Sequence, residues 1–551
     1  MGFESFLTRR LLLATLWLFR SALAHRKDEP ILSVRGKRQR RLSEEKYAWI
    51  QIGDSIIGEA VDDNSGHSVA INRVGDSVAV GARVADGPIE DTVNAGHVRV
   101  FVEDANGAWI QKGSDIDGEA EADRSGYEVA MNANGNILGI SARFNDNSNG
   151  QDSGHVRVFI YDSTITQDWV QMGQDLDGAG TSEWLESVAL SEDGLRVAIG
   201  ASRHPLGSFH GEVQVFDYDF TSELWVQAGQ DLGGLNVGDR FGGTIALSDS
   251  GGFLAVGGYG ADCSDDINDN CGHAEVFEYI TADDEWVQMG STLYGGDKSD
   301  YFGTDLALSG DGTILAVGAK RHLSFTGKVQ VFRFDSTTSD WVTMGQHIVG
   351  EATNDLSGTA LSLSTDGTKL AIGAWSNDSP FGTNSGHVRV FEYLSAADRW
   401  EQVGADIDGK DSTDGFGWSV AMNGDGSRIV AGAPDRPGED DSYKGAVRVF
   451  EYAKVTEAPS VSPTTAPSAA PSNSPSVQPS RTPSLKPTNP PIPALPTVLR
   501  VQETTVMPSP MPSQVPLEEC WVNIGRFFTD VTEWIVGLQA AVSDDFGKLG
   551  V

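Results

Sequence analysis

Short apolar runs separated by turn residues recur along most of the chain, and they predict strands. A typical unit opens on a tryptophan strand, continues with a short strand at 187–191 and turns through Asp193-Gly194. Asp-Gly between two apolar runs is typical of a two-residue hairpin, because its backbone tolerates the positive φ angles needed there. An apolar strand ending in Gly-Ala (197–201) and a Gly-x-Val-x-Val-Phe strand (211–216) complete the unit. Each unit therefore predicts four strands.

Seven copies of this unit follow one another. Each opens with a tryptophan strand of the pattern Trp-x-x-x-Gly, and successive tryptophans lie 55 to 61 residues apart. The seven are Trp49, Trp109, Trp169, Trp225, Trp286, Trp341 and Trp400. That period is too long for a helical solenoid and fits a four-stranded blade with its loops. Strands that are apolar on both faces suit blades packed between neighbouring blades. We predict an all-β, seven-bladed β-propeller over residues 48–453, with the repeated tryptophans packed between blades.

Two marks within the units resemble a known repeat. Phe416-Gly417 is followed by Gly432-Ala433-Pro434, and near copies are Phe241-Gly242 with Gly257-Gly258 and Phe302-Gly303 with Gly318-Ala319. This pair of marks is similar to the FG-GAP repeats, of which the integrin alpha-chain head is the best known. The resemblance implies that the Phe-Gly strand is innermost in each blade and the tryptophan strand outermost. It implies little about function, because one fold hosts many functions.

The order of the units predicts how the ring closes. A tryptophan strand comes first, and a proline-rich segment starts soon after Tyr452, so the last unit lacks an outer strand of its own. We therefore predict that the segment around Trp49 supplies that strand and pairs near 445–450. Closure of this kind removes exposed strand edges, which otherwise invite aggregation.

The loops are expected to divide into two faces. Connections after the tryptophan strand and after the Gly-Ala strand share one face, and many of them are long and acidic, as at 86–94 and 145–152. Loops on rigid scaffolds often carry binding sites, so we expect binding on this face; the alternative is that the loops only solvate an acidic protein. The candidate binding residues are Asp146, Asp152, Asp262, Asp265, Asp269, Asp440 and Asp441.

Calcium is the one cofactor that the loops suggest. Many FG-GAP repeats carry D-x-D-x-D-G loops, but the turns here, such as 423–427, are too short and lack the spaced carboxylates. Asp266, Asn268 and Asn270 instead place oxygen ligands at every second residue, a spacing that suits calcium. Turn-forming Asn and Asp are the alternative explanation.

The three cysteines are unevenly placed. Cys263 and Cys271 lie close together in the acidic loop that holds the candidate calcium ligands, and they predict a short-range disulfide in an oxidising compartment. Cys520 is left over, as a free thiol or an intermolecular bridge.

Two further sets of residues stand out. A histidine follows the glycine that starts a strand in four units, at His97, His155, His273 and His387. Packing is the simple explanation, although histidines that faced one rim would chelate a metal or sense pH. Trp184, Trp375 and Trp418 break the tryptophan pattern and are candidates for an exposed aromatic contact.

Charge and missing motifs exclude some functions. The formal net charge is -38, from 78 Asp and Glu against 40 Lys and Arg, so a nucleic-acid partner is not expected. The sequence contains no G-x-S-x-G, H-E-x-x-H or P-loop motif, and we predict that the protein is not an enzyme. Propeller enzymes with scattered active-site residues remain an alternative.

The N-terminal segments predict export. Residues 1–24 read as a signal peptide, with basic Arg9-Arg10, an apolar run at 11–19 and an Ala-x-Ala site ending at Ala24. The apolar run is too short to span a bilayer, and no later run predicts a transmembrane helix. Residues 25–47 form a basic linker or a propeptide, since 38–41 resembles the site cut by furin-like convertases.

The C-terminal segments predict a stalk and a small helix. Residues 454–516 are dominated by Pro, Ser, Thr and Ala, which predicts an extended, O-glycosylated stalk or a plain linker. In the tail, 517–551, apolar residues at spacings of 3 and 4 over 521–542 predict an amphipathic helix. That helix is expected to self-associate or dock on a partner.

These features predict a secreted, extracellular or cell-wall binding protein, serving in adhesion or as a scaffold. Its expected partner is an extracellular protein or glycan held on the acidic loop face. One alternative is a secreted propeller enzyme that acts on polysaccharide, which a cluster of carboxylates in a deep central pocket would favour. Another is a structural matrix protein.

Overall fold

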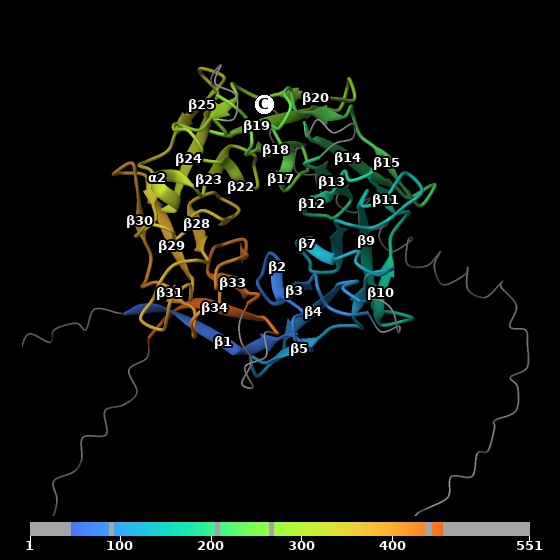
Figure 1. Cartoon of the computed structure of the whole chain (residues 1–551), viewed down its shortest axis with the longest axis horizontal. Coiled ribbons are helices and arrows are strands. Elements are labelled where there is room, and N and C mark those ends of the chain that lie inside the picture. The colour runs from blue at the N-terminus through green and yellow to red at the C-terminus, as the bar shows by residue number, and fades with distance from the viewer. Residues whose placement is uncertain (1–45, 88–92, 204–209, 264–268, 436–443, 456–551) are drawn as a thin grey trace, which may run out of the picture. The chain divides into compact units, whose positions relative to one another are not determined.

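The computed structural model describes residues 46–87, 93–203, 210–263, 269–435 and 444–455. These residues form seven antiparallel sheets arranged as blades around a central axis (Figure 1), which confirms the predicted seven-bladed propeller. The predicted signal peptide, basic linker, stalk and helical tail lie outside the described residues, apart from a few residues at their borders with the propeller. No helix among the described residues is long and apolar enough to cross a membrane.

The two strands of each blade nearest the axis form a hairpin. The innermost strands are β2 (Ser65–Ile71), β7 (Ser125–Met131), β12 (Leu185–Leu190), β17 (Phe241–Leu247), β22 (Phe302–Leu308), β27 (Ala360–Leu363) and β32 (Val420–Met422). Their partners are β3 (Ser77–Ala82), β8 (Ile137–Ala142), β13 (Arg196–Ala201), β18 (Phe253–Gly258), β23 (Ile314–Ala319), β28 (Lys369–Ala374) and β33 (Arg428–Ala433). The Phe-Gly strands are therefore innermost, as the repeat pattern predicts.

The third strand carries the Gly-x-Val-x-Val-Phe pattern, and the tryptophan strand lies outside it. The third strands are β4 (His97–Glu103), β9 (His155–Asp162), β14 (Glu212–Asp219), β19 (His273–Ile280), β24 (Lys328–Asp335), β29 (His387–Leu394) and β34 (Ala446–Lys454). The outer strands are β5 (Trp109–Gln111), β10 (Asp168–Gln171), β15 (Leu224–Gln227), β20 (Glu285–Gln288), β25 (Asp340–Thr343), β30 (Arg399–Gln402) and, in blade seven, β1 (Tyr47–Ile57).

A short second segment continues the outer strand of the first six blades and pairs again with the third strand. These segments are β6 (Ile116–Asp117), β11 (Leu176–Asp177), β16 (Leu232–Gly233), β21 (Leu293–Tyr294), β26 (Ile348–Val349) and β31 (Ile407–Asp408). A helical turn, α2 (His322–Phe325), lies in the loop between β23 and β24. We call the end of the propeller that carries this type of loop the loop face, and the opposite end the turn face.

The N-terminal strand closes the ring. β1 pairs antiparallel with β34, from Tyr47 opposite Lys454 to Ile57 opposite Ala446. Figure 1 shows β1 and β34 side by side, although nearly 400 residues separate them. The predicted closure is confirmed, and it leaves blade seven with the same four-strand order as the others.

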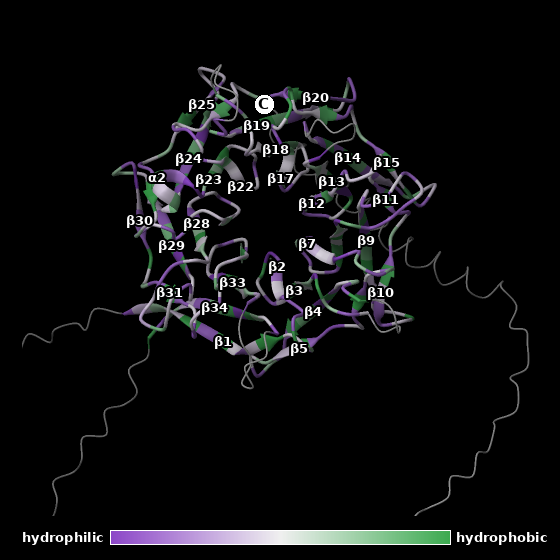
Figure 2. Ribbon diagram, viewed as in Figure 1, coloured by the Kyte–Doolittle hydropathy of each residue, from purple (hydrophilic) through white to green (hydrophobic). Residues whose placement is uncertain are grey.

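The hydrophobic core lies between the blades, because both faces of each sheet are covered. One buried cluster, for example, joins Val98 and Val100 of β4 to Leu138 and Ile140 of β8 in the next blade. In Figure 2 hydrophobic residues are concentrated on the strands, and hydrophilic residues are concentrated in the connections. The apolar character of both strand faces is thus explained by burial on both sides.

The repeated Trp-x-x-x-Gly motif connects neighbouring blades at their outer edges. The indole of each tryptophan donates a hydrogen bond to the residue before the motif glycine of the preceding blade, as from Trp225 to the Met172 carbonyl (2.7 Å). Trp49 donates to Val403 (2.9 Å) and completes the circle. The motif glycine has positive φ and touches the next indole, so no side chain fits there. The predicted inter-blade packing of the tryptophans is confirmed.

The turns between the two inner strands differ from the expected two-residue hairpins. In blade three the Ser191 N–H bonds to the Arg196 carbonyl, so the loop is longer, and Gly194 rather than Asp193 has positive φ. The reason is that the Ser191 hydroxyl accepts the Arg196 N–H and holds a wider turn. One residue of each turn donates its N–H to the next blade, and seven such bonds of 2.8–3.1 Å form a closed circle at the turn face.

Candidate functional site

The predicted acidic binding residues mostly close their own loops. Asp262 accepts the Asn270 N–H (3.0 Å), and Asp146 accepts the Asp152 N–H (2.8 Å). Asp152 and Asn270 both have positive φ, which is typical of turn-forming Asp and Asn. These carboxylates therefore shape the loop bases. Asp265, Asp266, Asn268, Asp440 and Asp441 lie outside the described residues.

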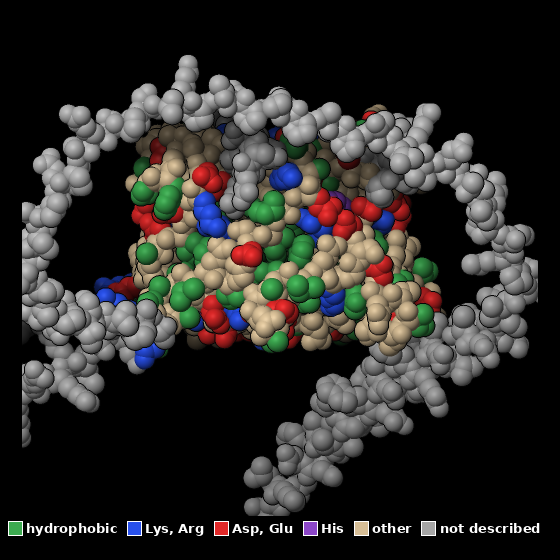
Figure 3. All heavy atoms as spheres, turned by 90° about the horizontal axis from the view of Figure 1, so that it is seen from below, with side chains coloured by type: hydrophobic (Ala, Val, Ile, Leu, Met, Phe, Trp, Pro, Cys, Tyr) green, Lys and Arg blue, Asp and Glu red, His purple; other side chains and the backbone are tan. Residues whose placement is uncertain are grey.

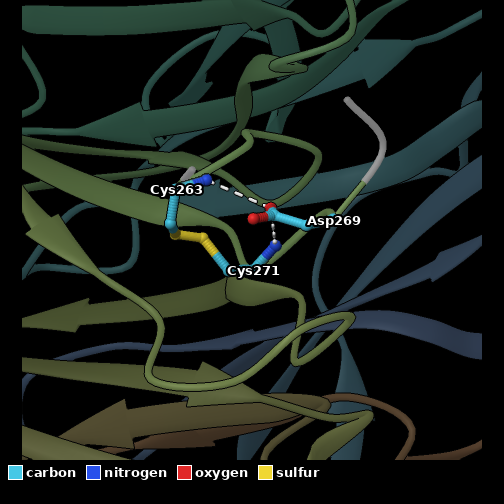
Figure 4. A group of neighbouring side chains, drawn as sticks. All are labelled: Cys263, Asp269 and Cys271. Atoms are coloured by element: carbon cyan, nitrogen blue, oxygen red, sulfur yellow. Dashed lines mark hydrogen bonds between the residues drawn. A yellow bond between two sulfur atoms is a disulfide. The ribbon is translucent and has the colours of Figure 1, made fainter. Parts of the chain in front are cut away.

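The loop of the predicted disulfide is held around one carboxylate. The structure joins Cys263 to Cys271, and Asp269 Oδ1 accepts the N–H of both cysteines at 3.1 and 3.3 Å (Figure 4). Because the two sulfur atoms are bonded to each other, they are not free to act as thiolate ligands. Of the three predicted calcium ligands only Asn270 is described, and calcium binding at this loop stays a prediction.

A different group of residues gathers where the central channel opens on the loop face. The Gly-Ala strands end at this face beside the axis, and the first two residues after four of them supply Arg83, Arg143, Arg203, Lys320 and Arg321. Trp184, Arg240 and Tyr301 directly precede innermost strands, Tyr127 lies in β7, and Tyr259 directly follows β18. The group, which we call the mouth cluster, consists of Arg83, Arg143, Arg203, Arg240, Lys320 and Arg321 with Tyr127, Trp184, Tyr259 and Tyr301. It spans blades one to five.

Arginine and aromatic side chains alternate in the first half of the mouth cluster. The Arg143 guanidinium lies 4.7 Å from the centre of the Tyr127 ring and 4.1 Å from that of Trp184. It also pairs with Glu186 at 3.1 Å. Arg203 lies over the Trp184 ring at 3.1 Å, so this indole contacts two cations. Contacts of this type are attractive and hold both partners in place.

The second half of the mouth cluster repeats the alternation. Arg240 donates to the Tyr259 hydroxyl (2.9 Å), and the Tyr259 and Tyr301 rings lie 5.9 Å apart. Arg321 lies 4.0 Å from the centre of the Tyr301 ring. The four aromatic residues of the mouth cluster are neither fully buried nor fully exposed.

An aromatic arc extends the lining through blades one, seven and six. His67 lies 5.0 Å from the Tyr127 ring and 5.6 Å from Trp418, and Trp418 lies 5.1 Å from Trp375. The three tryptophans that break the repeat pattern, Trp184, Trp375 and Trp418, therefore all belong to the channel lining. They are partly exposed, and whether they contact a ligand stays a prediction.

The cations of the mouth cluster act on one another. Burial lowers the pKa of Arg83, and the nearby charges of Arg124 and Arg143 lower it further. Burial likewise lowers the pKa of Lys320, with Arg321 and Arg240 adding to the effect. Three acids oppose this effect: Glu186 beside Arg143, Asp435 near Arg83 and Asp305 near Lys320. An anion at the mouth would relieve this repulsion.

Several donor groups of the mouth cluster also lack protein acceptors. The Nε atoms of Arg83 and Arg143 are buried and have no hydrogen-bond partner among the described residues. Buried donors are normally paired, and an unpaired one costs free energy. Anionic oxygens are the acceptors that guanidinium groups bind most strongly.

Two carboxyl groups lie deeper in the channel. Asp305 of β22 accepts the Leu361 N–H (2.6 Å) and the Thr244 hydroxyl (3.2 Å), and Glu128 of β7 accepts the Val188 N–H (3.2 Å). Both remain partly exposed, yet the surrounding protein removes most of their hydration. Desolvation raises the pKa of Asp305 to about 7 and also raises that of Glu128, which the charge of Asp305 raises further.

The turn-face end of the channel contains a small cavity with a mixed polar and apolar lining. A cavity of about 160 Å³ is lined by side chains from all seven blades, including Met131, Leu190 and Leu247. Arg73 reaches across its rim to pair with Glu192 and with Asp249 (2.9 Å). The outer wall shown in Figure 3 intersperses acidic, basic and apolar side chains without a continuous patch of one kind.

Sequence reasoning missed a repeated buried acid and the mouth cluster. An acid stands five residues after a glycine in every link to an innermost strand: Asp63, Asp123, Glu183, Asp239, Asp300, Asp355 and Asp414. All seven are buried, and Asp63 accepts the Ala60 N–H at 2.6 Å. Aligning the repeats on this glycine would have found them. The same alignment would have revealed the cations that follow the Gly-Ala strands. The net charge of -38 gives no sign of this local basic group.

The fold and the mouth cluster define a seven-bladed propeller with a basic, aromatic site at one end of its channel. No protein-family model matches the chain and no curated protein matches it, so the FG-GAP resemblance stays unconfirmed. Among solved structures, the chain is similar to Kuenenia stuttgartiensis hydrazine synthase, with 13% identity and a TM-score of 0.45. That match covers 72% of this chain and 98% of the other. At such a TM-score the likeness carries no argument about function.

Proposed function

We propose that the protein is a binding propeller that holds an acidic carbohydrate at the loop-face mouth of its channel. The mouth cluster is the observation that carries this proposal. Guanidinium forks bind carboxylate and sulfate groups bidentately, and aromatic rings supply flat apolar surfaces in ligand pockets. A partner with anionic groups on an apolar ring matches both kinds of side chain.

The acidic loops have a different part in this proposal. They surround a local basic site, so an anionic ligand is repelled at long range and attracted at contact. Interactions between exposed charges are screened within about 8 Å at physiological ionic strength, whereas partly buried ones are screened less. We therefore expect salt to weaken the binding less than it would at an exposed basic surface. Extracellular or cell-wall location stays a prediction from the leader sequence.

The test uses the full chain and three soluble probes: oligogalacturonate, sulfated dextran and unmodified dextran. Titration calorimetry should detect binding of an acidic probe and none of the neutral one. The combined change Arg143→Gln and Arg203→Gln should weaken that binding at least tenfold. Arg399→Gln, which removes an exposed arginine from the outer wall, is the matched control and should leave it unchanged. Equal loss in both variants, or binding of no acidic probe, would contradict the proposal.

A polysaccharide-degrading enzyme is the second candidate, because carboxyl groups lie in the channel below the mouth cluster. Glu128 and Asp305 have raised pKa values, and Glu186 lies near them. A carboxyl group that stays protonated near neutral pH is suited to act as a general acid. If the protein is such an enzyme, it should release reducing ends from the bound probe. Asp305→Asn should then abolish release while leaving binding at the mouth intact.

A further inference from the structure

The same trio of side chains occurs in three blades, away from the channel. Each trio has a glutamate from the link before the innermost strand, a histidine that starts the third strand and an aspartate from the connection between the two outer-strand segments. The ligand atoms of a trio all lie within 4.8 Å of one another. The trios are Glu59, His97 and Asp115 in blade one, Glu119, His155 and Asp175 in blade two, and Glu351, His387 and Asp406 in blade six.

The histidine of each trio is deeply buried. His97, His155 and His387 expose only 4, 1 and 1% of their surface. In each ring Nε2 has no hydrogen-bond partner among the described residues, and Nδ1 of His155 faces Glu119 Oε2 at 3.8 Å. Imidazole nitrogen is a common metal ligand.

An arginine holds the glutamate of each trio in place. Arg157 lies 3.3 Å from Glu119 Oε1, while the other oxygen, Oε2, faces His155. Arg99 holds Glu59 in the same way at 3.3 Å, and Arg389 lies 3.7 Å from Oε1 of the blade-six glutamate. In blade two, one carboxylate oxygen thus pairs with the arginine and the other faces the imidazole. Such outer contacts orient the ligands in known metal sites.

Comparison among the blades shows that the trio occurs as a set. Blade four keeps the histidine, His273, but has Leu235 in place of the glutamate and Thr292 in place of the aspartate. Blade five has Lys328 at the histidine position, and its ammonium group pairs with Asp300 at 3.2 Å. In blade four the position therefore lacks both carboxylate ligands, and in blade five it carries a positive charge of its own.

We propose that each trio binds one divalent first-row transition ion, with Zn²⁺ as the first choice and Mn²⁺ as the second. Imidazole nitrogen favours Zn²⁺, and the two carboxylates suit either ion. The glutamate and aspartate are partly exposed, which gives the ion a route from solvent, while water would complete its coordination. Three ions per chain would bind, at sites separate from the mouth cluster and from the predicted calcium loop.

The test measures metal stoichiometry in the full chain. After removal of metal with a chelator, titration with ZnCl₂ should reach saturation at three equivalents. Titration with Co²⁺ should give the visible absorption bands of a nitrogen- and oxygen-ligated ion. Glu119→Gln should remove one equivalent, and the triple change Glu59→Gln, Glu119→Gln and Glu351→Gln should remove all three. The Glu119 side chain is 46% exposed, so the fold should survive its replacement by an amide of equal size.

The matched control is His273→Gln in blade four, which has the histidine without its partners. This variant should still bind three equivalents of Zn²⁺. The circular dichroism spectrum of every variant shows whether the fold is intact, and so distinguishes loss of a metal site from loss of the fold. Zn²⁺ binding that is absent, never saturates, or is unaffected by the glutamate changes would overturn the proposal. Equal loss in the His273→Gln control would overturn it too.

Discussion

The closing contact between β30 and β1 gives a sharp test of the packing. Gly404 ends the Trp-x-x-x-Gly motif of blade six at φ +80°, and a Cβ placed on it would lie 2.8 Å from Trp49 Cδ1. Trp49 belongs to the strand that closes the ring. Gly404→Ala should therefore strain the backbone and push this indole away.

The expected cost can be estimated from two parts. A left-handed conformation costs alanine about 1–2 kcal/mol. Displacing the indole weakens the hydrogen bond from Trp49 to Val403, now 2.9 Å, whose net contribution is about 0.5–1.5 kcal/mol. Gly404→Ala should thus lower the free energy of unfolding by about 2–3 kcal/mol.

Guanidinium denaturation of the full chain, followed by tryptophan fluorescence, measures the effect as a lower midpoint. Gly296→Ala is the matched control, because Gly296 has no positive φ and the nearest atom to its Cβ position is Lys328 Nζ at 4.0 Å. The control should stay within about 0.5 kcal/mol of the original protein or be slightly more stable. If Gly404→Ala unfolds at the same midpoint as the control, the indole does not need the space that the glycine leaves.

Three more predictions concern other parts of the propeller. The pKa of Asp305 rises from 3.8 to about 7 on folding, so its protonated form favours the native state and stability should fall as pH rises from about 4 to 7. Calorimetry at a series of pH values should therefore show that the melting temperature of Asp305→Asn increases relative to that of the original protein as the pH rises over this range. A difference in melting temperature that does not change with pH would contradict the reasoning. Trp286→Phe removes the indole that donates to Ala228 at 3.0 Å and should cost about 2–3 kcal/mol, seen as a lower denaturation midpoint with an unchanged circular dichroism spectrum. Replacing both Cys263 and Cys271 by serine should cost about 2 kcal/mol by freeing the loop in the unfolded chain, and an unchanged thermal melt would show that the disulfide does not contribute.

Much of the fold could be predicted because it rests on local patterns. Apolar runs at strand spacing, bounded by turn residues, define a four-stranded unit wherever they occur, and seven tryptophans count the units. The position of Trp49 before the first complete unit predicts the closing strand without any knowledge of coordinates. The turn geometry was less predictable, since a side-chain hydroxyl at Ser191 selects the wider loop.

The candidate site could not be predicted in the same way. Arg83 and Arg321 are separated by more than 200 residues and belong to the same site only because the blades form a ring. Each proposed metal trio joins a link, a third strand and the connection between two outer-strand segments, so its members are also distant in sequence. The acidic composition led us to predict a binding site in the long loops. Asp146 and Asp262 there instead accept hydrogen bonds from backbone N–H groups of their own loops.

The sequence by itself determined the blade, the number of blades and the way they close, because hydrophobic periodicity is a property of neighbouring residues. Only the tertiary structure decided where charges and rings meet. The net charge of -38 gives no sign of the six cations of the mouth cluster. They form a local basic group only because the Gly-Ala strands end around one axis. Electrostatic interactions depend on distance in space, and closure of the ring sets those distances.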